Sequence, residues 1–565
     1  MKFLNIVPVV LGLGSTALAA PAEVLENRSK VTVSFPGGSV VGRSVLGTET
    51  FAGIPYAEPP VGDLRLRPPK RLGSQLNNYD ATGLSPACPQ MFVSNEARDL
   101  VGKVLGTLLK LPLLDQLDGK EDCLTVTVQR PAGVKAGDKL PVLFWIYGGG
   151  FELGATNTYD ASSLFSTANS QGQPFVFVSV NYRLNGFGFL PGKEVLKDGA
   201  TNLGLRDQRM GLEWVADNID AFGGDPSKVT IWGESAGSIS VFDQMLYKGG
   251  DANYKGKPLF RGSIMNSGSA VPADPVDCPK GQAVYDQVVN RAGCDGASDT
   301  LDCLRKAPYD KFYKAVTSLP GILSYNSVAL PYLPRPDGDV LPDSPEVLGK
   351  QGRFHAVPSI IGDQEDEGTL FSLFQTNVSS TDDLVRYLKD LYFANASEDQ
   401  IRTFVELYPE NISAGSPFRT TIFNEWNPGF KRRAALLGDI VFTLTRRVTL
   451  DFVNKFKPDM PTWSYLSSYD YGTPVMGTFH ASDILQVFYG ILPNHAMASC
   501  RTYYFNFLYN LDPNKGVGGY DNWPRWRDAK KLMWFKSATK NALLDDNFRQ
   551  EAADFLAQNA EYLHI

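Results

Sequence analysis

Hydrophobic residues occur along the chain in two patterns, short apolar runs and longer amphipathic stretches. The short runs predict buried strands at 140–147, 175–180, 229–232, 262–265, 359–361 and 462–466, the last of these being the final strand candidate. Apolar spacing of three and four residues predicts helices over 205–219, 239–247 and 431–455. Because strands and helices alternate, we expect an α/β fold with a large, mostly parallel sheet and helices on both faces.

Two regions depart from this alternation. Residues 31–35 and 40–45 flank Gly37-Gly38 and predict an N-terminal hairpin. Residues 267–344 have weaker periodicity and are interpreted as an insertion. Neither internal repeats nor a flexible linker divide the chain, so we predict one domain over residues 20–565.

The N-terminus has the organisation of a secretory signal. Lys2 precedes an apolar stretch over 3–13, and Ala17-Leu18-Ala19 fits a small-x-small cleavage site. We therefore predict a signal peptide over 1–19, cleaved after residue 19 or 20, and a secreted product. No later segment is long and apolar enough for a membrane span, so no integral membrane association is expected.

Composition narrows the range of partners. The net charge is −7 and no basic stripe occurs, which argues against a nucleic-acid partner. A monomer or weak homodimer is expected.

Six cysteines, an even number in a chain with a secretory signal, favour disulfides. No Cys-x-x-Cys pair is present, so a zinc site is not expected. Cys294 and Cys303 are near enough in sequence to close a small loop, and Cys88 with Cys123 would close a longer one. Cys278 and Cys500 remain, either paired or free. Asn-x-Ser/Thr triplets predict glycosylation at Asn27, Asn377, Asn395 and Asn411.

The main candidate for chemistry is the pentapeptide Gly233-Glu234-Ser235-Ala236-Gly237, which follows the predicted strand 229–232 and precedes a predicted helix. G-x-S-x-G in this context is typical of a sharp turn that exposes a nucleophilic serine. A serine hydroxyl needs a base that takes its proton and donors that hold the oxyanion. The remaining sequence offers candidates for both.

Only four histidines occur in the chain. In α/β hydrolases the base follows the acid in the sequence, and His355 precedes the best acid candidate. His564 is the penultimate residue and is expected to be frayed. His480 follows the last strand candidate in a turn-like loop, whereas His495 has no comparable setting and is expected on a surface loop. His480 is the predicted base.

The acid should follow a strand between Ser235 and His480. The segment 360–369 offers four carboxylates, Asp363, Glu365, Asp366 and Glu367. The sequence of this segment alone does not identify which of them is the acid.

The oxyanion donors should follow an earlier strand. Gly148-Gly149-Gly150 lies after 140–147, and glycines allow backbone amides to approach a substrate closely. A phosphate-binding loop would continue with Gly-Lys-Ser/Thr, which is absent here. Ala236, directly after the serine, would add one more N–H group.

With these features the chain resembles the type-B carboxylesterase/lipase family, which also contains the cholinesterases. It is most similar to the secreted fungal lipases of the Candida rugosa and Geotrichum type. The resemblance covers essentially the whole mature chain. It rests on the segments 51–57, 121–124, 181–183, 202–208 and 221–226 together with the serine pentapeptide.

The resemblance implies an α/β-hydrolase fold. No cofactor or metal motif appears in the sequence, so neither is expected. The resemblance assigns the catalytic acid to Glu367 and the base to His480. It places the oxyanion donors on Gly149, Gly150 and Ala236. It also pairs Cys88 with Cys123 and Cys294 with Cys303, and it offers no counterpart for Cys278 or Cys500.

The loop between Cys88 and Cys123 bears on the substrate. Leucines and valines crowd it with partly helical spacing. In the resembling lipases the matching loop is an amphipathic lid, so we predict a lid over about 88–123. The alternative is an ordinary helix held permanently on the core.

A lid favours a lipase that takes medium or long acyl chains at an oil–water interface. The enzymatic alternative is a carboxylesterase, or a sterol or feruloyl esterase, without interfacial activation. A non-enzymatic adhesion partner would lack the serine, so Ser235, Glu367 and His480 together argue against it.

Overall fold

The computed structural model describes residues 29–91, 119–469 and 472–565. The predicted signal peptide, Asn27 and most of the predicted lid lie outside these ranges. Within them, thirteen strands form one sheet. The strands are β1 (Ser29–Phe35), β2 (Gly38–Val45), β3 (Thr48–Pro55), β4 (Leu76–Asp80), β5 (Thr125–Pro131), β6 (Leu140–Ile146), β7 (Val176–Val180), β8 (Gly224–Glu234), β11 (Gly262–Asn266), β12 (Ser359–Gln364), β13 (Thr462–Ser467), β14 (Lys531–Phe535) and β15 (Ala542–Asp545). A separate short hairpin joins β9 (Asn253–Tyr254) to β10 (Lys257–Pro258).

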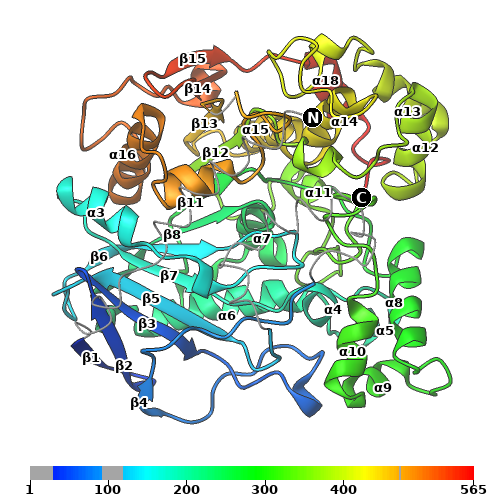
Figure 1. The fold of residues 1–565 in the computed structure, drawn as a ribbon. Helices are drawn as coiled ribbons and strands as arrows, with labels where there is room; N and C mark the ends of the chain where they lie inside the picture. The colour runs from blue at the N-terminus through cyan, green and yellow to red at the C-terminus, as the bar shows by residue number, and fades with distance from the viewer. Residues whose placement is uncertain (1–28, 92–118, 470–471) are drawn as a thin grey trace, which may run out of the picture.

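The sheet has the order β1-β2-β3-β5-β7-β6-β8-β11-β12-β13-β14-β15, with β4 beside β2. From β7 to β14 every neighbouring pair is parallel, which confirms the mostly parallel sheet expected from the sequence. Antiparallel strands flank this core at both edges. Figure 1 shows the blue N-terminal strands at one end of the sheet and β14 and β15 at the other.

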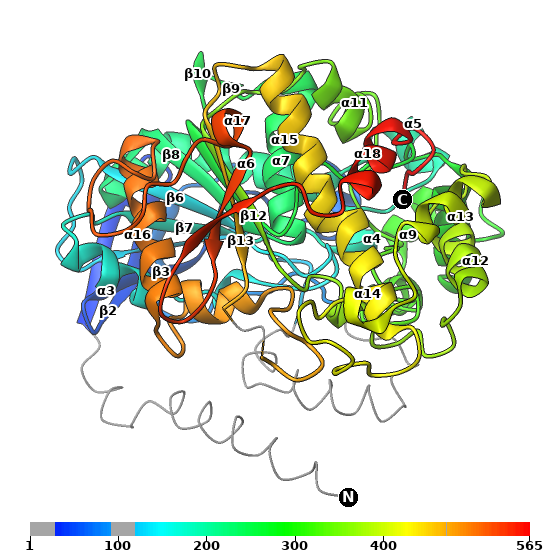
Figure 2. The same ribbon diagram turned by 90° about the horizontal axis from the view of Figure 1, so that it is seen from above.

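Helices cover both faces of the sheet. Figure 2 shows α3 and α16 on one side of the strands and α7 and α15 on the other. The helices are α3 (Ser162–Ser170), α4 (Asn185–Gly188), α5 (Lys193–Asp198), α6 (Leu203–Asn218), α7 (Ala236–Gly250), α8 (Pro279–Arg291), α9 (Thr300–Lys306), α10 (Tyr309–Val316), α11 (Pro345–Lys350), α12 (Thr381–Leu391), α13 (Glu398–Glu406), α14 (Phe430–Gly438), α15 (Leu444–Phe456), α16 (His495–Asn510), α17 (Trp526–Ala529) and α18 (Gln550–Gln558). Within the described residues, none of them is both long enough and apolar enough to cross a membrane.

The sequence pattern predicted some elements well and missed others. The hairpin and the six predicted strands are present, but 462–466 is not the last strand, because β14 and β15 follow it. β5 was also missed. Its Thr and Gln side chains resemble those of an exposed strand, yet all seven of its residues are buried. Their polar atoms find partners inside, as when the Gln129 side chain donates to the Tyr159 carbonyl.

The predicted helix over 431–455 is also more complex than expected. α14 continues through a π-helical turn, Asp439–Thr443, into α15. At the start of that turn the buried Asp439 carboxylate accepts hydrogen bonds from Tyr408 Oη and from the Arg549 guanidinium. The extra backbone turn thus lies where a polar side chain is bound inside the protein.

Candidate active site

The residues singled out in the sequence converge on one edge of the sheet. The carboxyl ends of parallel strands meet at the same edge, and the four segments of interest directly follow β6, β8, β12 and β13. These are the glycine loop, Ser235, the acidic loop and the segment with His480. Topology therefore brings together groups that are up to 331 residues apart, the interval from Gly149 to His480.

Ser235 occupies a strained turn between β8 and α7, with φ of 58° and ψ of −127°. A non-glycine residue in such a conformation costs on the order of 1–3 kcal/mol. The turn is too tight to accommodate a side chain at Gly233 or at Gly237. A Cβ at Gly233 would lie 2.2 Å from the Gly237 carbonyl oxygen, and a Cβ at Gly237 would lie 2.0 Å from the Ile146 carbonyl oxygen. The G-x-S-x-G pattern is thus required by the packing of this turn.

The glycine loop lies directly beside Ser235. A Cβ added to Gly148 would lie 2.8 Å from the Ser235 Cβ, and Gly149 and Gly150 have φ of +110° and +64°. Within the described residues, the amide N–H groups of Gly149, Gly150 and Ala236 donate to no other group of the protein. Three unused donors near one serine form the kind of site that binds an oxyanion.

Three of the four candidate carboxylates are held by partners other than His480. Asp363 pairs with Arg446 at 2.8 Å, and Glu365 pairs with Arg419. Asp366 accepts hydrogen bonds from the backbone of Phe418 and Thr478 and from the Ser416 hydroxyl, so it joins the acidic loop to the segment that carries His480.

Glu367 is the member of this set that contacts the histidine. Its Oε2 lies 2.5 Å from His480 Nδ1, and its Oε1 accepts a hydrogen bond from the Gln364 backbone N–H at 2.7 Å. The imidazole also packs against the rings of Phe371 and Phe442. Glu367 and the two rings fix the position of the imidazole, and the contact with Glu367 engages Nδ1 and leaves Nε2 on the other side of the ring.

The second imidazole nitrogen faces a different acid. His480 Nε2 lies 3.3 Å from Oε1 of Glu234, the residue before Ser235. Within the described residues, Nε2 makes no hydrogen bond, and none joins His480 to Ser235. Both residues are nearly inaccessible, with exposed fractions of 4% for His480 and 6% for Ser235. Catalytic hydrogen bonds are often long in unliganded enzymes and shorten when substrate binds.

Burial and charge act in opposite directions on these groups. Burial would lower the pKa of His480, but the nearby Glu367 and Glu234 carboxylates raise it to about 9. Burial raises the pKa of Glu234 to about 8, against the opposing effect of His480. Burial and nearby Glu367 also raise the pKa of Asp483 to about 6, although Asn266 donates to it. The site therefore favours a positive charge on the imidazole.

An apolar cavity opens beside Ser235 and runs along the first two turns of α7. Its walls are Gly150, Phe151, Ser235, Ala236, Ile239, Asp243, Val271, Ile322, Val328, Leu330, Leu333, Pro334, Pro345, Val441, Phe442 and Ile565. Phe442 also contacts His480, so the cavity and the histidine share a wall.

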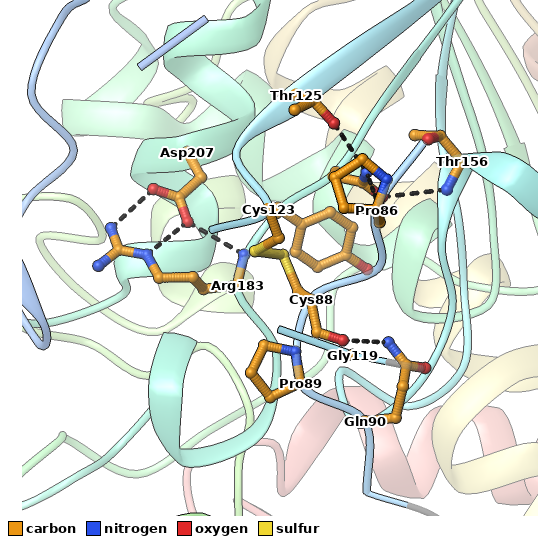
Figure 3. Close-up of a disulfide and its surroundings, with 12 residues drawn as sticks. Pro86, Cys88, Pro89, Gln90, Gly119, Cys123, Thr125, Thr156, Arg183 and Asp207 are labelled. Carbon is orange, nitrogen blue, oxygen red and sulfur yellow. Dashed lines mark hydrogen bonds and ion pairs between the residues drawn. A yellow bond between two sulfur atoms is a disulfide. The ribbon is translucent and has the colours of Figure 1, made fainter. Parts of the chain in front are cut away.

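The structure contains two disulfides, Cys88–Cys123 and Cys294–Cys303. Figure 3 shows the first of these, together with Gln90, whose side chain donates to the Cys88 carbonyl. The Gln90 side-chain carbonyl also accepts from Gly154 N–H, just beyond the glycine loop. This disulfide thus joins the two ends of the predicted lid close to the candidate oxyanion donors.

Two histidines outside the site, His564 and His495, differ from what the sequence predicted. His564 is not frayed, because its imidazole lies between Asp274 at 3.1 Å and Glu346 at 2.9 Å. His495 is the first residue of α16 and packs against Tyr520 rather than lying on a surface loop.

The two cysteines without a predicted partner, Cys278 and Cys500, are separate buried thiols. The three described glycosylation candidates, Asn377, Asn395 and Asn411, are exposed.

Sequence reasoning missed three buried acids at the site. Glu234 lies inside the serine pentapeptide, so its position next to the nucleophile could have identified it. Glu152, in the glycine loop, accepts a hydrogen bond from Ile322 N–H, and burial raises its pKa to about 8. Asp243 lines the cavity two turns along α7, on the face that Ala236 and Ile239 share. Helical spacing alone does not reveal that this face borders a cavity.

The chain matches a known protein family and is similar to two fungal lipases. The model of the carboxylesterase family matches residues 28–556. A secreted triacylglycerol lipase of Gibberella zeae is 63% identical over 97% of this chain and 93% of its own length. Lipase 4 of Diutina rugosa is 44% identical over 98% of each chain.

Solved structures agree in fold. Aspergillus niger EstA superposes with a TM-score of 0.78 at 24% identity, and the match covers 95% of this chain and 99% of that one. A PNB esterase has a TM-score of 0.72 at 26% identity, with coverage of 93% and 100%.

Proposed function

The chain belongs to the carboxylesterase family, and on this basis we propose that it is a secreted triacylglycerol lipase that hydrolyses esters through an acyl-enzyme. The contact between His480 Nδ1 and Glu367 Oε2, next to the strained Ser235, is the observation that carries the proposal. Secretion is supported by the names of the relatives from Gibberella zeae and Botryotinia fuckeliana.

In the proposed mechanism Ser235 Oγ attacks the ester carbonyl while His480 Nε2 takes its proton. Glu367 orients the imidazole and stabilises its charged form. The tetrahedral oxyanion accepts hydrogen bonds from the N–H groups of Gly149, Gly150 and Ala236. His480 then protonates the leaving alcohol, and a water molecule that it activates releases the acid.

The cavity supports an acyl substrate. Nearly all the residues that line it are apolar, and it begins at Ser235, where the acyl carbon would be attached. Burying each methylene of an acyl chain contributes about 0.8 kcal/mol, so an apolar lining favours medium or long chains. The lid over about 88–123 remains a prediction from the sequence.

The test is the initial rate against tributyrin concentration through its solubility limit, with a soluble short-chain ester as control. A jump in rate at the limit is expected for a lipase. Saturation below the limit without a jump would favour a carboxylesterase. Ser235→Ala should remain folded and lose turnover on both substrates, and wild-type turnover in that variant would overturn the mechanism.

A further inference from the structure

Asp243 is a buried acid that the proposed mechanism does not use. It is 1% exposed and lines the apolar cavity beside Ser235. Neither of its carboxyl oxygens has a hydrogen-bond partner within the described residues. Among the side chains that line the cavity there, Asp243 alone is ionisable.

The surroundings of Asp243 determine its protonation. An ionised carboxylate without a partner is very costly in an apolar interior, so the group neutralises instead. Burial accordingly raises the pKa of Asp243 well above its ordinary value. A protonated carboxyl has one O–H donor and a carbonyl acceptor, and no other group of the described residues binds either of them.

The position of Asp243 along α7 sets its depth in the cavity. Ala236, Ile239 and Asp243 have helical spacing of three and four residues, and all three line the cavity. Seven residues at about 1.5 Å each place Asp243 roughly 10 Å beyond Ala236 along the helix axis. An extended alkyl chain, with bonds of about 1.5 Å at tetrahedral angles, advances about 1.25 Å per carbon. Asp243 therefore lies at the depth of roughly the eighth acyl carbon.

We propose that Asp243 is a specificity residue that binds the hydroxyl group of a hydroxylated acyl chain, about eight carbons from the scissile carbonyl. This inference rests on the proposed ester hydrolysis at Ser235. A hydroxyl at that depth donates to one carboxyl oxygen and accepts from the other. A plain alkyl chain covers the carboxyl and leaves it unpaired, which is unfavourable.

The test uses 4-nitrophenyl esters of ω-hydroxy acids with about 5–12 carbons. Each is compared with the unsubstituted ester that has the same number of chain atoms, so that the two differ in polarity and not in length. The measured quantity is the ratio of kcat/KM for the hydroxy ester to that for the alkyl ester. This ratio should peak near 8–9 carbons, about tenfold above its value at the shortest and longest chains.

Two variants distinguish binding from packing. Asp243→Leu is similar in size and apolar, and it should remove the peak. Asp243→Asn keeps a donor and an acceptor without charge, and it should retain the peak. A flat profile in the wild type, or a peak that persists in Asp243→Leu, would overturn the inference. If the leucine variant does not fold, the dependence of the kcat/KM ratio on chain length in the wild type still tests the inference.

The acetyl ester separates this inference from the proposed function. Its acyl group is too short to reach Asp243, so its hydrolysis by the wild type depends on Ser235 and not on the role proposed for Asp243. No hydrolysis of the acetyl ester by the wild type would contradict the proposed function. Hydrolysis of the acetyl ester with a flat length profile would contradict only the role of Asp243.

Discussion

Glu234 Oε1 lies 3.3 Å from His480 Nε2, while Glu367 Oε2 lies 2.5 Å from Nδ1 of the same ring. The imidazole therefore lies between two carboxyl groups, one adjacent to the nucleophile in sequence and one on the acidic loop. Both carboxylates raise the pKa of His480. This arrangement stabilises the imidazolium. The neutral imidazole that acts as a base therefore forms only at a higher pH.

Replacing Glu234 should therefore move the pH dependence of the reaction. In Glu234→Gln the pKa of His480 falls, because a negative charge that raises it is lost. The acid limb of the kcat/KM–pH profile should shift to lower pH by about one unit. Rates measured between pH 5 and 10 on a soluble ester, whose own ionisation does not change, provide the test. An acid limb at the wild-type position would show that Glu234 does not act on His480.

The choice among four carboxylates is testable with a matched pair of variants. Glu367→Gln removes the charge that contacts His480 and should lower kcat roughly 10³–10⁴-fold, by analogy with loss of the acid in other serine hydrolases. Glu365→Gln, two residues away, weakens the pairing with Arg419 and should leave kcat within about twofold, since this partly exposed ion pair does not contact His480. Equal losses in the two variants would argue against a special role for Glu367.

The turn at Ser235 should not accept a methyl group at Gly237. A Cβ there would lie 2.0 Å from the Ile146 carbonyl oxygen, so the backbone must shift. Gly237→Ala should destabilise the protein by about 2 kcal/mol or more, with loss of activity. Gly296→Ala is the control, because a Cβ at that position meets nothing within 4 Å. Denaturant unfolding of both variants measures the difference, and similar stabilities would contradict the packing argument.

His564 should make stability depend on pH in the alkaline range. Burial would lower its pKa, but hydrogen bonds with Asp274 and Glu346 raise it from 6.5 to about 9. Because the pKa is raised in the folded state, its contribution is complete below about pH 6.5 and is lost as pH rises through about 9. The wild-type Tm should therefore fall between pH 7 and 10 by more than that of His564→Asn.

His495→Asn serves as the matched control for this measurement. His495 takes part in no ion pair within the described residues, so its replacement should leave the fall in Tm between pH 7 and 10 unchanged. Loss of the charge on His564 should also affect the wall of the cavity, because the adjacent Ile565 lines it. An equal fall in Tm for the wild type and His564→Asn would show that the charged contact of His564 does not cause it.

Local chemistry was sufficient to predict much of the site from the sequence. The serine turn was predictable because only glycine fits at Gly233 and Gly237, and that requirement is visible as a short motif. His480 was predictable because few histidines occur and chain order excludes His355. The central strands were predictable because burial on both faces makes them continuous apolar runs.

Tertiary structure decided what depends on contacts between distant segments. The residues of the acidic loop alone did not select Glu367, because the choice depends on Arg446 and Arg419 occupying Asp363 and Glu365. His564 was expected to be frayed, but it is held by acids 290 and 218 residues away. Asp243 reads as one polar position in an amphipathic helix, and only the packing around α7 shows that it is buried without a partner beside the acyl cavity.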